Sequence, residues 1–257
     1  MQAGKFCAGN RFTVTLTTAM LCLGQGFSLA QVKPVAQQGW ETTAAAGVTL
    51  TRGNSRTFLA NLSLDTRRKW ERDEAALGVS GGYGETTVNG SDQKNTEYLK
   101  SFGQYNRLFN DRLYGGVRLD GEYDGIAGVD YRFRVSPLIG YYVVKEPKTS
   151  LAFEVGPSVV LEKLKPRSSR IYLGARFGER FEHKLSDTTK VWQRLEYIPD
   201  VEHWTQKYLV IGEIGIDTAI TRKLSLRTVL QDNYDNAPAA GRQKNDLRLI
   251  AGMAYKF

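Results

Sequence analysis

The feature that most constrains this chain is a period of two in its apolar residues, repeated along most of its length. In the last stretch Arg248 and Lys256 lie between apolar residues spaced two apart, at Leu247, Leu249, Ala251, Met253, Tyr255 and Phe257. Such alternation places one set of side chains on each face of a β-strand. The pattern predicts an all-β fold of twelve strands, at residues 40–52, 55–69, 74–85, 95–109, 112–124, 130–144, 149–162, 169–185, 188–199, 204–220, 223–235 and 244–257.

The alternation is clearest in the stretches 130–144 and 149–162. Each carries at least six apolar residues on one face, with charged, serine and glycine residues on the other. Pro137 and Pro157 fall on the apolar faces and are a small cost in any sheet, because a soluble sandwich would restrict such prolines to edges or bulges.

The connections between the expected strands alternate in length. One set is short: 71–73, 110–111, 146–148, 186–187 and 221–222. The other set is mostly longer, with only 53–55 short: 86–94, 125–129, 163–168, 199–203 and 236–243. Short turns at one end and longer loops at the other are typical of bacterial outer-membrane β-barrels. Aromatic residues near many strand ends match the interfacial girdles of such barrels, although strands are in any case rich in aromatics.

The first thirty residues have the order of a secretory signal peptide. Lys5 and Arg11 carry the only charges, an apolar run follows, and Ser28 and Ala30 supply small residues before a cleavage site after Ala30. Cys22 would permit a lipoprotein, but the residues before it match a lipidation motif poorly. The expected domains are a signal peptide at 1–30, a short periplasmic lead at 31–39 and a barrel at 40–257.

Composition narrows the class further. Both cysteines, Cys7 and Cys22, precede residue 31, so the exported chain is expected to lack disulfides. Of the 35 basic residues, 33 remain after residue 30 against 27 acidic ones, a net charge of +6, but they form no run that would indicate nucleic-acid binding. No apolar stretch after residue 30 is long enough for a membrane helix. A membrane-spanning form would therefore be a closed barrel.

If the apolar face meets lipid, the opposite face lines the barrel interior. The candidate lumen-lining residues are Arg118, Asp120, Glu122, Arg132, Arg134, Glu154, Arg176, Arg180, Arg194, Glu196, Glu213, Asp217, Arg227 and Arg248. Their charges are nearly balanced, and antiparallel pairing sets Asp120 opposite Arg134, Glu122 opposite Arg132, and Asp217 opposite Arg227. We expect an ion-paired lumen and not a wide pore of one sign.

Glu179 breaks the pattern, because it shares the parity of the apolar residues. A β-bulge would turn it inward, or it would lie near the membrane interface, where the cost of a charge is small.

Two alternatives compete with a non-enzymatic membrane barrel. In a soluble β-sandwich the charged faces would be the solvated outside. An outer-membrane hydrolase would need a catalytic set, but only His183 and His203 are available, with no nucleophile motif around a serine. Two histidines without cysteine also give no metal-ligand spacing. We therefore expect no catalytic residues, no metal and no cofactor.

Three stretches resemble a known family. They are GWETTAAAGVTLTRGNSRTFLANLSLDTRR, YRFRVSPLIGYYVVKEPKTSLAFEVGPSVV and FEHKLSDTTKVWQRLEYIPDV. Their order and spacing are similar to the salt-induced outer-membrane proteins, a family known as domain of unknown function 481, over roughly Trp40 to Phe257. The resemblance implies an outer-membrane location and a barrel-like β-fold, and it implies no reaction.

The function expected from the sequence is a non-enzymatic outer-membrane barrel of the Gram-negative envelope, related to salt or osmotic stress. A narrow channel for small, anionic solutes is the alternative. The expected partners are outer-membrane lipid, lipopolysaccharide and the outer-membrane assembly machinery, with no nucleic acid. Tyr255 and Phe257 are expected to belong to the assembly signal, since bacterial barrels end on an aromatic residue.

Overall fold

The computed structural model describes residues 39–52, 55–88 and 91–257. These residues form strands, turns and bends, and they include no helix able to cross a membrane. The expected signal peptide and all but the last residue of the expected lead lie outside the described residues.

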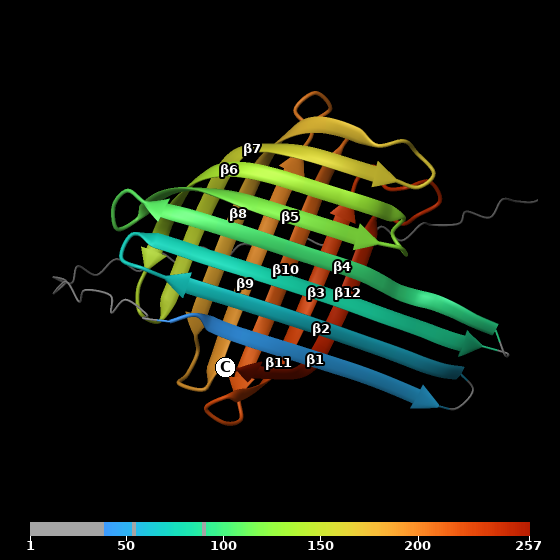
Figure 1. The fold of residues 1–257 in the computed structure, drawn as a ribbon, viewed down its shortest axis with the longest axis horizontal. Helices are drawn as coiled ribbons and strands as arrows, with labels where there is room; N and C mark the ends of the chain where they lie inside the picture. Colours follow the sequence, from blue (N-terminus) through green and yellow to red (C-terminus); the bar gives the residue numbers. More distant parts are fainter. Residues whose placement is uncertain (1–38, 53–54, 89–90) are drawn as a thin grey trace, which may run out of the picture. The chain divides into compact units, whose positions relative to one another are not determined.

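The alternating stretches form the strands of one antiparallel sheet (Figure 1). The strands are β1 (Glu41–Arg52), β2 (Ser55–Lys69), β3 (Asp73–Val88), β4 (Ser91–Leu108), β5 (Leu113–Asp124), β6 (Val129–Lys145), β7 (Thr149–Leu164), β8 (Arg170–Lys184), β9 (Thr189–Pro199), β10 (Tyr208–Ala219), β11 (Leu224–Asp235) and β12 (Asn245–Lys256). All are within a few residues of their expected bounds except at two places described below.

Each strand pairs with its neighbours in sequence, and β1 pairs with β12, so the sheet closes into a barrel. The all-β, twelve-stranded antiparallel barrel predicted from the alternation is confirmed. In Figure 1 strands β1 to β4 cross in front of strands β10 to β12, which form the opposite wall. The soluble sandwich of two stacked sheets is therefore wrong.

The pairing that closes the barrel, the β1–β12 seam, is short. All of β1, from Glu41 to Arg52, pairs with β2, whereas only Thr43–Ala46 pair with β12. The seam is extended by the backbone N–H of Phe257, which donates to the carbonyl of Thr42 at 3.0 Å. Among the described residues of these strands, β1 beyond Ala46 has no ladder partner in β12.

Two expected boundaries were wrong. The stretch 86–94 was expected to be a loop, but β3 continues to Val88 and β4 begins at Ser91, with a register shift at Gly84/Glu85. Threonine-rich and polar residues can continue a strand pair where no apolar core is required. The tenth strand was expected from residue 204, but residues 201–207 form bends and turns, and β10 begins at Tyr208.

The two prolines lie at one level of the β6–β7 pair. The β6–β7 ladder pairs Val135 with Val159 and Ile139 with Val155, and the residues between form no ladder pairs across these two strands. Inside the barrel at this level the hydroxyl groups of Ser136 and Ser158 hydrogen-bond at 2.8 Å. The missing proline N–H groups thus coincide with a gap in the ladder that interior side chains bridge.

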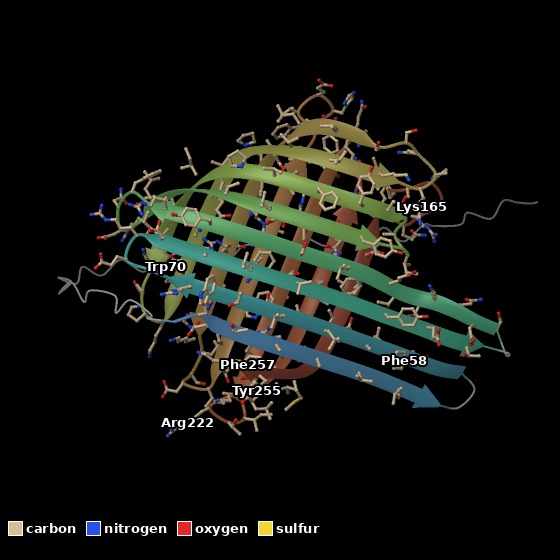
Figure 2. The ribbon with its side chains drawn as sticks, viewed as in Figure 1. Phe58, Trp70, Lys165, Arg222, Tyr255 and Phe257 are labelled. Atoms are coloured by element: carbon tan, nitrogen blue, oxygen red, sulfur yellow. The ribbon has the colours of Figure 1, made fainter. Side chains whose placement is uncertain are left out.

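The outer face of the barrel is apolar. Leucine, valine, isoleucine and phenylalanine side chains of every strand are exposed there, as illustrated by Leu249 at 69% and Phe153 at 50%. Aromatic rings gather towards the strand ends, where Trp40 meets Trp70 and Tyr255 meets Phe257. Figure 2 labels Trp70, Tyr255 and Phe257 at the end of the barrel with the short turns, and Lys165 at the end with the longer loops.

Glu179 remains on the outer face. The register of β8 with both neighbours runs through it without a shift, so the bulge suggested above is absent. Its carboxylate instead accepts a hydrogen bond from Nε2 of Gln193 on β9 at 3.0 Å. One polar pair therefore interrupts the apolar outside.

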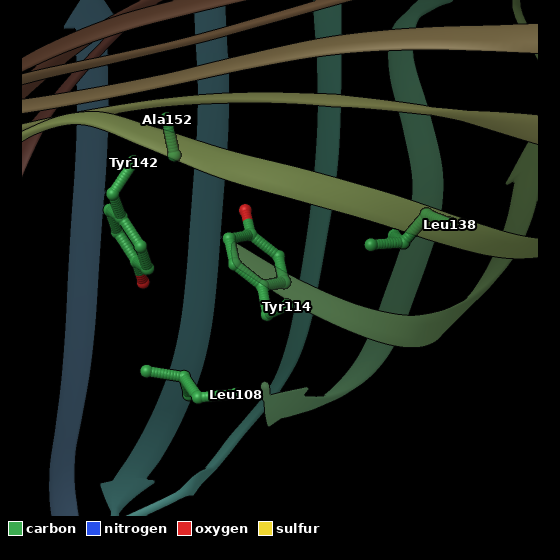
Figure 3. Packing of buried hydrophobic residues seen from close by; sticks show 5 residues of the cluster. All are labelled: Leu108, Tyr114, Leu138, Tyr142 and Ala152. Carbon is green, nitrogen blue, oxygen red and sulfur yellow. The ribbon is translucent and has the colours of Figure 1, made fainter. Parts of the chain in front are cut away.

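Inside, large aromatic side chains lie over glycines directly across a strand pair. Tyr114 is fully buried within the cluster Leu108, Tyr114, Leu138, Tyr142 and Ala152 (Figure 3). Its register partner is Gly140, where an added Cβ would collide with the Tyr114 ring. The same arrangement recurs for Tyr98 with Gly82, Phe102 with Gly78, and Trp192 with Gly215. These glycines give the rings room inside a barrel of modest bore.

Candidate functional site

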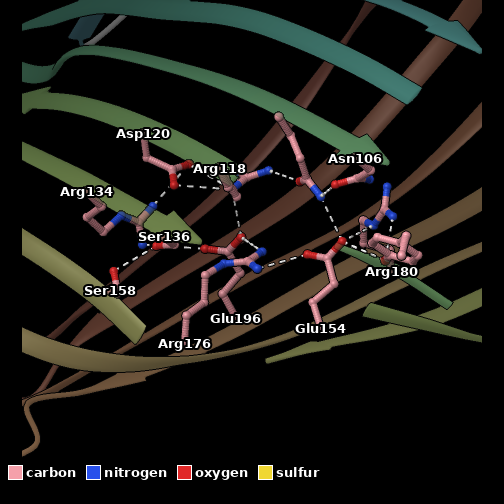
Figure 4. A network of polar contacts seen from close by, with 12 residues as sticks. Asn106, Arg118, Asp120, Arg134, Ser136, Glu154, Ser158, Arg176, Arg180 and Glu196 are labelled. Carbon is pink, nitrogen blue, oxygen red and sulfur yellow. Dashed lines mark hydrogen bonds and ion pairs between the residues drawn. The ribbon is translucent and has the colours of Figure 1, made fainter. Parts of the chain in front are cut away.

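The middle of the barrel interior contains a cluster of alternating arginines and carboxylates from β5 to β9 (Figure 4). This central cluster consists of Arg118, Asp120, Arg134, Glu154, Arg176, Arg180 and Glu196. Around Glu196, a nitrogen of Arg176 lies at 2.7 Å and one of Arg118 at 3.1 Å. Arg118 also contacts Asp120, at 2.8 Å. Because most of these groups are buried, each charge depends on its neighbours for stabilisation.

Glu154 is the second acidic centre of the central cluster. Its carboxylate accepts hydrogen bonds from Gln104 and Tyr114, both at 2.8 Å, and from Arg176 at 2.9 Å. Nε of Arg180 lies 3.0 Å from the same group. Arg176, which is only 2% exposed, therefore joins Glu154 to Glu196 and links the two halves of the cluster.

A second group of charges, the long-loop cluster, lies towards the longer loops. Arg132 contacts Glu162 at 2.9 Å, Glu122 at 3.2 Å and Asp235 at 2.6 Å. Lys207, in the connection before β10, reaches Glu162 at 3.1 Å and Asp235 at 3.3 Å. Burial lowers the pKa of Lys207, while both carboxylates act in the opposite direction. The long-loop cluster therefore connects residues of the longer loops to residues of the adjacent strands.

Further interior charges lie on the side of β1–β4 and β9–β12. Arg227 contacts Asp217 at 2.8 Å and Asp65 at 3.4 Å. Arg248 contacts Asp124 at 2.6 Å across the interior. These contacts are fewer and less buried than those of the central cluster, so this side of the interior is less densely filled.

All the candidate lumen-lining residues lie on inward faces. The central cluster includes Arg118, Asp120, Arg134, Glu154, Arg176, Arg180 and Glu196; the long-loop cluster includes Glu122 and Arg132; the other side has Arg194, Glu213, Asp217, Arg227 and Arg248. The register brings together the three ion pairs expected from the turns. It also brings Arg194 opposite Glu213, but their side chains form no ion pair.

Several interior residues were not anticipated as part of this site. Gln104 and Tyr114 donate to Glu154, and Tyr142 donates to Glu74 at 2.6 Å. Their inward parity was visible in the sequence, but their partners lie several strands away. Lys207 lies in a loop, where parity gives no information about direction, and Asp235 is the last residue of β11.

Cavities remain beside the central cluster, and neighbouring ones share lining residues. A cavity of about 370 Å³ lies at the short-turn end, and two of about 110 and 90 Å³ lie further in. A fourth, of about 30 Å³, lies near the longer loops and borders Glu122 and Asp235. Its volume is comparable to that of a single water molecule. The free space thus narrows from the short-turn end towards the longer loops.

The two histidines lie at opposite ends of the barrel. His183, near the short-turn end, shares a hydrogen bond with the hydroxyl of Thr149 at 2.8 Å. His203 lies in the loop before β10, 3.7 Å from a carboxylate oxygen of Asp200. Among residues 39–52, 55–88 and 91–257, no group of histidine and acidic residues could hold a metal ion.

These features define a class of protein: a closed, twelve-stranded antiparallel β-barrel with an apolar outside and an ion-paired interior. The chain belongs to the family described as protein of unknown function, DUF481, which matches residues 44–257. The resemblance to domain of unknown function 481 seen in the sequence is therefore confirmed.

A solved porin structure shows a similar fold, and two further barrels match at lower TM-scores. The NanC porin matches with a TM-score of 0.51 and 6% identity, covering 84% of this chain and 100% of that chain. The translocator domain of the autotransporter NalP from Neisseria meningitidis matches with a TM-score of 0.46 and 16% identity, covering 88% and 91%. The KdgM porin gives a TM-score of 0.43 and 10% identity, covering 85% and 99%. Comparison with curated proteins finds no match.

Proposed function

We propose that this protein is a non-enzymatic barrel of the bacterial outer membrane whose interior is braced by ion pairs and leaves a narrow passage for water and small ions. The observation that carries the proposal is that one side of the interior is filled by charged side chains while the other side retains cavities. The central cluster closes much of the bore, and the neighbouring cavities run beside it from one end towards the other.

The outer surface supports a membrane location. Exposed apolar side chains cover every strand, whereas monomeric soluble proteins rarely expose patches larger than about 300–600 Å². Closure pairs every strand with two neighbours, except that β1 beyond Ala46 pairs only with β2, and internal pairing of the backbone is the condition for crossing lipid. The surrounding partners would be outer-membrane lipid and lipopolysaccharide, and insertion would depend on the outer-membrane assembly machinery.

The charged interior supports a restricted bore. A barrel of twelve strands is intermediate between eight-stranded barrels, which side chains fill, and sixteen-stranded porins, which hold an aqueous channel. Here the two centres around Glu154 and Glu196 join β4 to β9 through side chains, so widening the bore would require charged contacts to separate. Buried charges separated from their partners are costly, which keeps the cluster closed.

Conductance in planar lipid bilayers tests the proposal. Protein that shows heat-modifiable migration, and is thus folded, should give small currents, well below those of a sixteen-stranded porin. Glu196→Gln should enlarge or prolong the openings, because three arginines lose their shared acid. A large, steady current from the unaltered protein would contradict the braced interior. Absence of current from folded, inserted protein would contradict the passage.

A role in salt or osmotic stress is a further part of the proposal and rests on the family resemblance. Cells lacking the protein should then grow more slowly at high salt, and the unaltered gene should restore growth. Equal growth of both strains at high and low salt would remove this part of the proposal without affecting the passage.

A further inference from the structure

Arg194 on β9 reaches across the interior to Phe102 on β4. The guanidinium carbon lies 5.4 Å from the centre of the Phe102 ring and 5.3 Å from that of the Trp192 ring. Strands β4 and β9 are five places apart in the closed order, so this contact joins separate parts of the wall. Arg194 and Phe102 both line the cavity of about 370 Å³ and the cavity of about 110 Å³. Their contact therefore marks the boundary between these two cavities.

Arg194 also differs from the other inward-facing arginines in its charge balance. Within the described residues it has no carboxylate within ion-pair distance, whereas all the others do: Arg67, Arg118, Arg132, Arg134, Arg176, Arg180, Arg227 and Arg248.

The acids near Arg194 are engaged elsewhere. Glu213, its register partner, accepts a hydrogen bond from Gln231 at 2.8 Å. Asp65 faces Arg227 at 3.4 Å, and Glu182 faces Arg67 at 3.2 Å. The guanidinium therefore has no direct acidic partner among the described residues and retains N–H donors, and Asp65 and Glu182 act on its charge only from a longer distance.

A guanidinium with free donors binds carboxylate or phosphate through two parallel hydrogen bonds. The Phe102 and Trp192 rings hold its position and shield part of it from water, which strengthens its interaction with an anion. We propose that Arg194 is an anion-binding subsite in the passage, taking small solutes that bear a carboxylate or phosphate group. The Arg194–Phe102 contact is the constriction that such a solute must displace. This inference rests on the proposed passage.

A direct test uses Trp192 as a fluorescent reporter and requires no transport. In a detergent-solubilised variant with Trp40, Trp70 and Trp204 changed to Phe, iodide should quench Trp192 more strongly than neutral acrylamide does. Arg194→Gln should lower this iodide-to-acrylamide ratio several-fold, and Arg194→Lys should restore part of it. Inorganic phosphate, added at constant ionic strength, should compete with iodide only when Arg194 is present.

The matched control removes a nearby charge pair without changing the net charge. The double variant Lys256→Gln, Glu41→Gln alters the same cavity, because both residues line it with Trp192. It leaves Asp65 with Arg227 and Glu182 with Arg67. It should leave the ratio unchanged. A ratio that Arg194→Gln does not alter, or that the control lowers equally, would overturn the subsite. Heat-modifiable migration verifies folding of each variant. If the variant that retains only Trp192 does not fold, the iodide-to-acrylamide ratio is compared between the unaltered protein and Arg194→Gln with all four tryptophans present.

Bilayer measurements separate this inference from the proposed function. Across a salt gradient, Arg194→Gln should reduce the preference for chloride over potassium by about tenfold, the effect of one charged hydrogen-bonding group. Phe102→Ala should raise the conductance by removing the constriction. Current with unaltered ion preference would overturn the subsite and leave the passage. A ratio that falls in the quenching experiment without any current would support the subsite and overturn the passage.

Discussion

Arg176 provides the sharpest test of whether ion pairs hold the barrel interior together. It is 2% exposed and lies 2.9 Å from Glu154 and 2.7 Å from Glu196. Arg176→Met keeps an unbranched, apolar stem but removes the charged guanidinium. Loss of one partner from a buried ion pair costs about 3–5 kcal/mol. Glu154 retains Arg180, and Glu196 retains Arg118, so we expect the lower end, about 3 kcal/mol.

The measurement is urea unfolding of protein inserted in lipid vesicles, followed by tryptophan fluorescence and by heat-modifiable migration. The matched control is Arg107→Met, because Arg107 contacts Asp73 at 2.7 Å with 54% of its side chain exposed. That exposed pair should contribute only about 0–1 kcal/mol. If Arg176→Met is no more destabilising than Arg107→Met, the central cluster does not hold the interior together and the reasoning fails.

Two further predictions concern packing and assembly. Gly140→Ala should destabilise the barrel by about 1–3 kcal/mol in the same urea unfolding measurement, because the new methyl group meets the Tyr114 ring. The control is Gly212→Ala, which should be nearly neutral because the nearest atom to its new methyl group would lie at 3.7 Å. Deletion of Phe257 should lower the amount of heat-modifiable protein in the outer membrane more than Leu247→Ala does, and equal amounts of the two variants there would contradict a role of Phe257 in assembly.

The sequence was sufficient to predict most of the fold, because alternation and turn length are local properties. The pairs Asp120–Arg134 and Asp217–Arg227 followed from counting outward from short connections. The extension of β3 and β4 was missed, because polar residues there carry no alternation. The late start of β10 was missed because Trp204 looked like a strand-end aromatic, whereas it packs on Phe177 and Tyr197 from the loop.

The interior contacts between distant strands could not be predicted in the same way. Parity places Tyr114 and Glu154 inside, but their 2.8 Å hydrogen bond depends on the curvature of the whole wall. The same holds for Arg194. It lacks a carboxylate partner because Glu213 accepts a hydrogen bond from Gln231 and Asp65 contacts Arg227. A sequence specifies which residues face inward more directly than which of them meet.

The shortness of the β1–β12 seam has a consequence for the order in which the barrel forms. Its paired residues, Thr43–Ala46 and Met253–Lys256, are separated by most of the chain, whereas every other strand pairs with its neighbour in sequence. Closing a segment of some two hundred residues costs about 2–3 kcal/mol more in chain entropy than closing a ten-residue hairpin. Only four ladder pairs offset that cost, whereas every other strand pair has at least eight. The curved sheet from β1 to β12 should therefore form first as an open wall, and its two edges should join last and separate first.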